Sequence, residues 1–267
     1  MFRASRVDAH PCMHAHAIER AAASRGRRSR RGEGGVMNDY FRDRVDAGRQ
    51  LAAHLADYAN RSDVIVLALP RGGVPVAYEV AKALRVKLDV LIVRKLGAPG
   101  NPELAMGAIA AGGVVLLEQS VLRTMRVSER ELADTIERER DELARREAAY
   151  RGDRAPPDVE GRTVIVVDDG IATGSTMLAA IEAVRERKPA KLVAAVPVAS
   201  PSSAEKVKAA ADAIVCVMRP DWLMGIGQFY RDFDQTSDDE VRTLLGRARE
   251  WERPAGGDAS TAGAGPG

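Results

Sequence analysis

Short apolar runs alternate with segments of helical spacing, and this alternation limits the fold more than any other feature of the sequence. Each run holds six to nine residues, mainly Val, Ile, Leu and Ala, as expected of strands buried on both faces. The runs lie at 63–69, 88–93, 163–168, 191–199 and 213–218, and the helical segments between them at 74–84, 175–187 and 202–211. Strands that alternate with helices predict a central, mainly parallel sheet flanked by helices, with ligands at the carboxyl ends of the strands.

The pattern changes in the middle of the chain. Residues 105–118 (AMGAIAAGGVVLLE) predict two strands around the Gly-Gly pair at 112–113, which is typical of a hairpin turn. Ser128 and Glu131 have the spacing of a capping box. They predict the start of a long charged helix that extends to about residue 149.

The two ends of the chain lack this apolar periodicity. Residues 1–36 are rich in Arg, Ser and His and predict a disordered basic leader, and the Gly/Ala-rich residues 252–267 predict a disordered tail. Helical spacing begins at Met37, so we expect translation to start there; an Arg-rich mitochondrial transit peptide is the alternative. These boundaries predict one globular domain, residues 37–251.

Charge and cysteine content narrow the class of protein. The formal net charge is +2 at pH 7, and residues 1–36 contribute +5 of it, so residues 37–267 carry −3. A nucleic-acid binder would show a broad basic excess, so we expect no nucleic-acid partner and only local recognition of phosphate. Cys12 and Cys216 lie too far apart in the sequence for a disulfide framework, and no apolar run approaches about 20 residues. We expect a cytoplasmic protein that does not bind a membrane.

Two strand ends carry residues suited to binding an anion. The first strand leads into LPRGGVP, in which Gly72 and Gly73 lack Cβ atoms and allow backbone N–H groups to converge on an anion beside Arg71. An ordinary strand-to-helix turn is the alternative there. A later strand leads into DDGIATGST, where Gly174 precedes a helix whose N-terminus offers free N–H groups.

Asp168 and Asp169 directly precede this second anion site, although carboxylates repel phosphate. Carboxylates accept hydrogen bonds from hydroxyls, so the pair is explained if the ligand carries a sugar diol beside its phosphate. The ligand predicted by these residues is a ribose 5-phosphate. The GK[ST] ending of a P-loop and the G-x-G-x-x-G pattern are both missing from the sequence, which argues against a kinase or a dehydrogenase.

The segment VIVVDDGIATGSTM, residues 164–177, resembles the signature of the type I phosphoribosyltransferases, which bind 5-phosphoribosyl 1-pyrophosphate (PRPP). LPRGG is similar to the pyrophosphate loop of that superfamily, and the resemblance extends over about residues 40–235. The chain is most similar to the bacterial proteins known only as predicted phosphoribosyltransferases. The resemblance implies an α/β fold of the type I phosphoribosyltransferase class, in which a central, mainly parallel sheet carries a small hood and a flexible active-site loop.

The resemblance also implies a role for each motif residue. Asp168 and Asp169 would hold the ribose hydroxyls, directly or through Mg²⁺, the implied cofactor. The 5-phosphate would be wrapped by the five residues Ala172, Thr173, Gly174, Ser175 and Thr176. Gly72, Gly73 and the catalytic Arg71 would hold the pyrophosphate, and the peptide before Arg71 would be cis.

The loop predicted between Arg94 and Gly107, RKLGAPGNPELAMG, has the position of the family's flexible catalytic loop. By resemblance, Arg94 and Lys95 would be catalytic residues that neutralise the departing pyrophosphate; charges that simply end a strand are the open alternative. A closed loop would exclude water from the activated sugar. Glu103 would be a catalytic proton acceptor for the base, because ATGST and RKLGAPG resemble two loops of the adenine enzymes.

The acceptor is less closely defined. Enzymes for 6-oxopurines carry an Asp at the position of Ala172, so the resemblance disfavours hypoxanthine and guanine. Trp222, Phe229 and Tyr230 follow the last strand in a chain with only 4% aromatic residues. Their rings either stack on a base or close the core beneath a loop.

Together these features predict a Mg²⁺-dependent pentosyltransferase that moves 5-phosphoribose from PRPP to a nitrogenous base and releases pyrophosphate. The alternative is a regulatory protein that binds PRPP or a nucleotide without catalysis, because function resides in the site and not in the fold. Cations at Arg71, Arg94 and Lys95 near the leaving group favour the enzyme. The implied partners are PRPP and a small nitrogenous acceptor, and the family is compatible with a homodimer.

Overall fold

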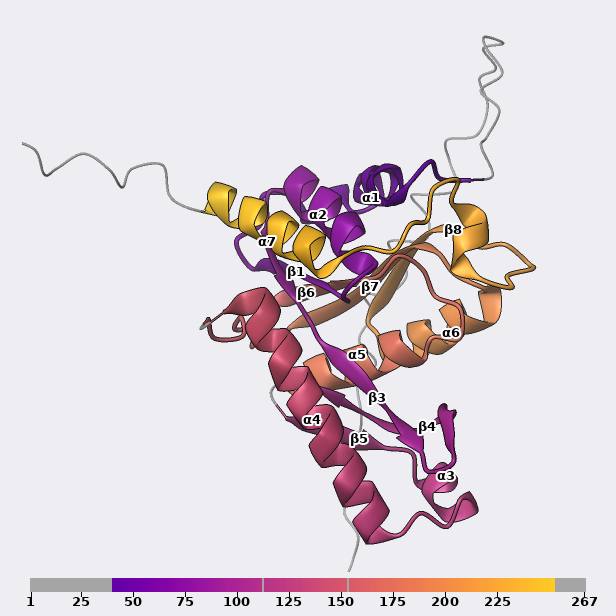
Figure 1. The fold of residues 1–267 in the computed structure, drawn as a ribbon. Helices are drawn as coiled ribbons and strands as arrows, with labels where there is room; N and C mark the ends of the chain where they lie inside the picture. The colour runs from indigo at the N-terminus through magenta and orange to yellow at the C-terminus, as the bar shows by residue number, and fades with distance from the viewer. Residues whose placement is uncertain (1–39, 112, 153, 253–267) are drawn as a thin grey trace, which may run out of the picture. The chain divides into compact units, whose positions relative to one another are not determined.

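The computed structural model describes residues 40–252 except Gly112 and Asp153, and it leaves the side chain of Glu103 undescribed (Figure 1). The predicted leader, the predicted start at Met37 and the predicted tail, apart from Glu252 at the end of a helix, lie outside these residues.

A five-stranded parallel sheet forms the centre of the fold, as predicted, with the strand order β2-β1-β6-β7-β8. Its strands are β1 (Val64–Ala68), β2 (Lys87–Val90), β6 (Thr163–Val167), β7 (Lys191–Val198) and β8 (Ala213–Met218). Every residue of β1 and β6 is buried. Their unbroken apolar sequence therefore lies in strands that are covered on both faces.

Helices cover the two faces of this sheet (Figure 1). Those on one face are α1 (Arg44–Ala53), α2 (Gly73–Leu84) and α7 (Asp238–Glu252), and those on the other are α5 (Ser175–Arg185) and α6 (Pro201–Ala210). Successive strand residues point to opposite faces, so Val66 joins the core under α2 whereas Leu67 joins the core under α5.

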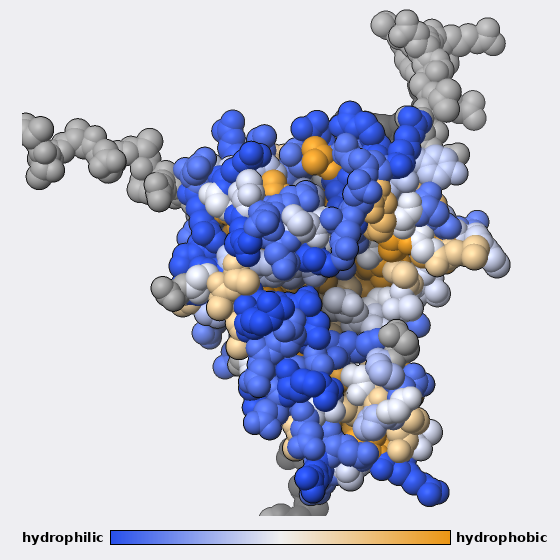
Figure 2. Space-filling view, viewed as in Figure 1, coloured by the Kyte–Doolittle hydropathy of each residue, from blue (hydrophilic) through white to orange (hydrophobic). Residues whose placement is uncertain are grey.

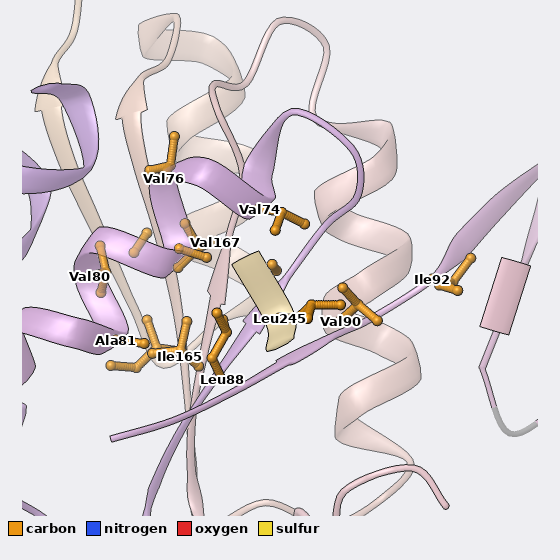
Figure 3. Packing of buried hydrophobic residues seen from close by; sticks show 14 of the residues in the cluster. Val74, Val76, Val80, Ala81, Leu88, Val90, Ile92, Ile165, Val167 and Leu245 are labelled. Atoms are coloured by element: carbon orange, nitrogen blue, oxygen red, sulfur yellow. The ribbon is translucent and has the colours of Figure 1, made fainter. Parts of the chain in front are cut away.

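Figure 3 shows the first of these cores, where the valines of α2 face apolar side chains of β2 and β6. Val80, Val90 and Val167 are fully buried there, and Leu245 of α7 is almost so. Because this packing fixes α2 on the sheet, it also fixes the glycine-rich loop that leads into α2.

A second, antiparallel sheet, here called the hood sheet, has the strand order β3-β4-β5. Its strands are β3 (Val93–Ala98), β4 (Asn101–Ala110) and β5 (Val114–Leu117). The long helix α4 (Glu129–Arg151) packs against β3 and β4, and α5 contacts all three strands. Helix α5 therefore touches both sheets.

The structure corrects one prediction in the hood sheet. The sequence predicts a loop over residues 94–107, because Gly and Pro are concentrated there, but this segment forms the paired strands β3 and β4 around a turn at residues 99–100. The register shifts at Gly97, where an added Cβ would lie 2.7 Å from the carbonyl oxygen of Pro102. Glycine permits this approach, so the supposed loop formers support an irregular hairpin.

Other local predictions are confirmed. Strands β4 and β5 form the hairpin predicted around residues 112–113. Ser128 and Glu131 form the capping box, in which the Ser128 N–H donates to Glu131 Oε2 at 2.9 Å. Helix α4 continues to Arg151, whose buried guanidinium donates to Asp89 Oδ1 at 3.0 Å and so ties the end of α4 to β2.

Two helices were not predicted, namely α3 (Gln119–Thr124) and α7. Single-turn 3₁₀ helices also form at Ala56–Tyr58 and Ile226–Phe229. Polar and charged side chains dominate the face seen in Figure 2. No helix within the described part of the chain combines the length and the apolar character needed to cross a membrane.

Candidate functional site

The two predicted anion loops lie side by side, because β1 and β6 are neighbours in the sheet. Ala68 and Val167, the last residues of the two strands, are paired, and the Leu69 N–H donates to the Val167 carbonyl at 2.9 Å. The loop 69–73 after β1 and the loop 168–174 after β6 therefore start from adjoining strand ends. Parallel strands place their carboxyl ends at one edge of the sheet, where α/β folds bind ligands.

The two glycines of the first loop are required by contact between the loops. A Cβ on Gly72 would lie 2.0 Å from Asp169 Oδ2, and a Cβ on Gly73 would lie 2.8 Å from the Val167 carbonyl oxygen. A larger residue at position 73 would clash with the backbone of β6, and one at position 72 would displace the Asp169 carboxylate. The Pro70–Arg71 peptide is cis, as the resemblance implied.

The carboxylates of Asp168 and Asp169 occupy the junction of the two loops. Asp168 Oδ1 accepts the Asp169 N–H at 2.9 Å. Burial, together with the neighbouring Asp169 carboxylate, raises the pKa of Asp168 well above its usual range. Burial also raises the pKa of Asp169, while the Arg44 guanidinium acts in the opposite direction. Both carboxyl groups therefore lie in surroundings that disfavour uncompensated charge.

Arg44, the first residue of α1, is a site residue that the sequence did not reveal. Its Nε donates to Asp169 Oδ2 at 2.9 Å, and its Nη2 lies 2.9 Å from the same oxygen. Its Nη1 donates to the Asp234 carbonyl at 2.7 Å, and its guanidinium carbon lies 3.9 Å from the centroid of the Phe233 ring. Because 125 positions separate Arg44 from Asp169, no local spacing pattern could have indicated the pair.

The residues after the acidic pair form a cradle in front of α5. A pocket of about 180 Å³ there is lined by Asp168, residues 170–177 and Ile226. Gly174 has φ +87°, a left-handed conformation suited to glycine, and directly precedes α5. The side chains of Ala172, Thr173, Ser175 and Thr176 are exposed. Backbone N–H groups at a helix N-terminus, with nearby hydroxyls, can hold a phosphate.

Neighbouring elements fix the shape of this cradle. The Ser203 hydroxyl of α6 donates to the Ala172 carbonyl at 2.5 Å, and the Ile171 N–H donates to the Val198 carbonyl at 2.8 Å. A Cβ on Gly170 would lie 2.6 Å from Ile226 Cγ2. The cradle is therefore preorganised by packing on β7, α6 and the segment after β8.

Arg71 lies half-buried at the other side of the glycine loop. Its Nη1 is 3.9 Å from Asp238 Oδ1 at the start of α7. The same carboxylate oxygen accepts the Tyr150 hydroxyl at 2.5 Å, and this bond and the Arg71 charge lower the pKa of Asp238. Burial, with a contribution from Asp238, raises the pKa of Tyr150 to about 12. A long ion pair therefore links the partly exposed Arg71 side chain to the start of α7.

The hood-sheet candidates Arg94 and Lys95 both line a pocket of about 520 Å³ beside α4, and a second cavity includes Lys95 but not Arg94. Arg94 donates to Glu139 Oε2 of α4 through Nε at 3.0 Å and Nη2 at 2.7 Å. Lys95, the next residue in the strand, points to the opposite face and lines a cavity of about 360 Å³ that also includes Ser175 and Thr176. Glu103 lies in β4, and its side chain is outside the description. Of the three, the structure associates Lys95 with the cradle.

The three aromatic candidates have different surroundings. Trp222 is 77% exposed, and Phe229 is half-buried. Tyr230 is buried, its ring packs near Phe41 and Phe233, and its hydroxyl donates to the Asp169 carbonyl at 2.6 Å. Tyr230 therefore supports the backbone of the acidic pair, whereas Trp222 is largely exposed.

The acidic pair also fits the usual way in which proteins bind Mg²⁺. Within the described residues, no group of three or more His, Cys, Asp and Glu side chains is arranged to hold a metal ion. Mg²⁺ commonly binds through one or two carboxylates together with phosphates of the substrate. Asp168 and Asp169, beside a phosphate cradle, supply donors of that kind.

Comparison with known families matches residues 39–234 to the Phosphoribosyl transferase domain. The chain belongs to this family. Membership confirms the resemblance seen in the sequence motif, and the two-sheet architecture confirms the α/β fold with a hood that this resemblance implied.

Curated relatives and a solved structure agree with this assignment. Two Mycobacterium tuberculosis proteins, from strains CDC 1551 and H37Rv, each bear the name "Putative phosphoribosyl transferase" and are 46% identical over 217 residues. The match covers 81% of this chain and 48% of each relative, so the chain spans about half the length of these curated relatives. The crystal structure of TT1426 from Thermus thermophilus is 43% identical, with a TM-score of 0.69, over 79% of this chain and 99% of that one.

Proposed function

We propose that this phosphoribosyl transferase domain moves the 5-phosphoribosyl group of PRPP to a nitrogenous base and releases pyrophosphate. The observation that carries the proposal is the junction of the RGG loop with the Asp168–Asp169 pair, directly beside the phosphate cradle at 172–176. A ligand with a phosphate, a diol and a pyrophosphate in sequence has a partner for each group at this one strand edge.

Each part of PRPP has proposed partners. The cradle residues 172–176 bind the 5-phosphate through backbone N–H groups at the start of α5 and through hydroxyls. Asp168 and Asp169 accept hydrogen bonds from the ribose hydroxyls. Gly72 and Gly73 present the backbone of the first loop to the pyrophosphate, and Arg71 adds a positive charge.

The proposed chemistry is attack of a base nitrogen on C1 of the ribose, with departure of pyrophosphate from the same carbon. The chain's contribution is to position the base and to stabilise the negative charge of the leaving group. Arg71 and Lys95 are the proposed cations for that charge. Mg²⁺, when bound through the acidic pair and the ligand phosphates, would add further charge stabilisation.

The proposed acceptor is a base other than a 6-oxopurine, because Ala172 stands where those enzymes carry an Asp. Trp222 is the proposed stacking residue, since the residue is 77% exposed and lies in the segment that follows β8. Phe229 shapes the same segment, and Tyr230 holds it to Asp169. Glu103 remains the proposed proton acceptor.

A regulatory function without catalysis is the second candidate. The observation that favours it is the Arg94–Glu139 pair, because this contact directs one of the three expected cations toward α4. A sensor would need the cradle and the acidic pair but no second cation at the leaving group.

The test is pyrophosphate release by the full chain with PRPP and Mg²⁺ across a panel of purine, pyrimidine and other nitrogen bases. Release that depends on one base supports the transferase and identifies the acceptor. PRPP binding without base-dependent release supports the regulator, and failure of the folded chain to bind PRPP contradicts both.

A further inference from the structure

We infer that Arg44 is a positioning residue for the sugar diol: it holds the Asp169 carboxylate against the glycine loop and thereby sets the orientation in which Asp169 meets the ligand. The inference rests on the proposed function, since it takes Asp169 as a partner of the diol. Arg44 itself acts through Asp169 and need not touch the ligand.

Arg44 contacts a single oxygen of the Asp169 carboxylate. Both guanidinium contacts, from Nε and Nη2, converge on Oδ2 at 2.9 Å. The same oxygen faces Gly72, because a Cβ there would lie 2.0 Å from Oδ2 and 3.4 Å from Arg44 Nε. Oδ2 is thus enclosed between the guanidinium and the loop. These contacts at Oδ2 restrict rotation of the Asp169 carboxylate about its side-chain bonds.

The guanidinium is itself held in place from several directions. It donates to the Asp234 carbonyl at 2.7 Å, lies over the Phe233 ring, and only 12% of the Arg44 side chain is exposed. The planar fork of Arg can satisfy these partners at once, which a Lys ammonium on a flexible stem cannot do equally well. Arg44 is therefore a rigid support.

The segment before α1 is tied to the segment that supplies these partners. The Phe41 N–H donates to the Phe229 carbonyl at 2.8 Å, and the Arg231 N–H donates back to the Phe41 carbonyl at 2.9 Å. Tyr230, between them, donates its hydroxyl to the Asp169 carbonyl at 2.6 Å. Asp169 is consequently held at its side chain by Arg44 and at its backbone by Tyr230.

The positive charge of Arg44 also compensates the negative charge of the acidic pair. Two adjacent carboxylates beside a site for an anionic ligand repel one another and the ligand, and burial increases that cost. A cation attached to the Asp169 carboxylate offsets the repulsion. Asp168 lines the cradle pocket, whereas Arg44 and Asp169 lie outside its lining, so Arg44 acts on the acidic pair and not on the phosphate cradle.

The test measures binding of two probes, ribose 5-phosphate and inorganic phosphate, to the full chain by calorimetry. Inorganic phosphate needs only the cradle, whereas ribose 5-phosphate also needs the acidic pair. We expect Arg44→Gln to weaken ribose 5-phosphate binding about tenfold, the scale of a hydrogen bond to a charged group, and to leave phosphate binding within about twofold. Arg44→Lys should recover part of the loss.

Arg49→Gln is the matched control. Arg49 lies on the same helix, but its side chain is 61% exposed and its ion pair, at 3.0 Å, is with Glu79 of α2 and not with the acidic pair. This change removes the same charge from α1 and should leave the affinity for both probes unchanged. Equal weakening by Arg49→Gln and Arg44→Gln would overturn the inference, because the effect would then belong to the helix.

A double-mutant cycle with Asp169→Asn shows whether Arg44 acts through Asp169. If it does, Arg44→Gln adds little to the loss already caused by Asp169→Asn. Additive losses overturn the inference, as does parallel loss of both probes in a folded Arg44→Gln variant. If Arg44→Gln does not fold, selective loss of ribose 5-phosphate in Arg44→Lys supports the inference, and unchanged affinity overturns it.

The same binding measurements distinguish failure of the proposed function from failure of the Arg44 inference. A wild-type chain that binds phosphate but shows no gain for ribose 5-phosphate overturns the proposed function and the inference with it. A wild-type chain whose ribose 5-phosphate affinity falls in Asp169→Asn but not in Arg44→Gln overturns the inference alone.

Discussion

At the scale of single residues, the RGG loop shows why glycine is needed at the site. Gly72 lacks a side chain because Asp169 Oδ2 occupies the space that a Cβ would need, at 2.0 Å. The sequence suggests a different reason, free approach of backbone N–H groups to an anion. The structure adds contact between the two loops as a second requirement, and this requirement can be tested without knowing the ligand.

We predict that Gly72→Ala lowers stability by about 1–3 kcal/mol, because the new methyl group must displace the Asp169 carboxylate from its contact with Arg44. Chemical denaturation measures the change. Ribose 5-phosphate affinity should fall in the same variant. A Gly72→Ala chain with unchanged stability and unchanged affinity would contradict the packing between the two loops.

Arg71 provides a second test at this scale. We predict that Arg71→Ala weakens PRPP binding much more than ribose 5-phosphate binding, because the guanidinium is assigned to the pyrophosphate and only PRPP carries one. Competition calorimetry with the two ligands measures the difference. Equal loss of both affinities would show that Arg71 supports the site as a whole, through its 3.9 Å approach to Asp238.

At the scale of elements, the hairpin β3–β4 separates two residues that the sequence places together. Arg94 and Lys95 are consecutive, but a strand sends their side chains to opposite faces, Arg94 toward Glu139 of α4 and Lys95 toward the start of α5. In a loop, as predicted from the Gly and Pro residues, both could have reached the leaving group.

We therefore predict a split between these neighbours. Arg94→Gln should lower stability by about 1 kcal/mol, through loss of the pair with Glu139, and leave base-dependent pyrophosphate release nearly unchanged. Lys95→Gln should lower base-dependent pyrophosphate release. Denaturation curves and pyrophosphate-release rates for both variants test these predictions. Full activity in Lys95→Gln would show that Lys95 does not take part in the reaction.

In helix α7 we predict a substitution that raises stability. Gly246 lies within this helix, and nothing lies within 4 Å of an added Cβ. We predict that Gly246→Ala raises stability by about 0.5–1 kcal/mol, the difference in helix propensity between the two residues, and leaves ligand affinity unchanged. Denaturation of this variant also serves as the control for Gly72→Ala. A loss of stability would show that the helix surface around Gly246 is covered.

The elements that the sequence predicts well are those with a strong local signal. Strand β1 is an unbroken apolar run, β6 and β7 are apolar after their first residues, Thr163 and Lys191, and the start of α4 has a capping box. Helix α7 was missed because its charged residues outnumber its buried ones, although Val241, Leu245 and Ala248 share one helical face. The β3–β4 hairpin was missed because its glycine and proline residues resemble those of a loop.

At the scale of the whole molecule, the site depends on contacts between segments far apart in the sequence. The motif predicts the cradle and the acidic pair, because both lie within residues 168–176. Arg44, Tyr230 and Asp238 reach the site only through the order of strands and the path of the chain after β8. No spacing rule carries that information, so Arg44 and Asp238 could be found only in the structure, and so could the contact of Tyr230, a base-stacking candidate from the sequence, with the Asp169 carbonyl.

We propose that the adjoining ends of β1 and β6 form one PRPP site. The most direct measurement is a crystal structure of the full chain with PRPP and Mg²⁺. We predict the 5-phosphate in the cradle at residues 172–176, the ribose hydroxyls at Asp168 and Asp169, and the pyrophosphate at residues 71–73. PRPP bound away from this strand edge, or bound with its phosphate outside the cradle, would contradict the account.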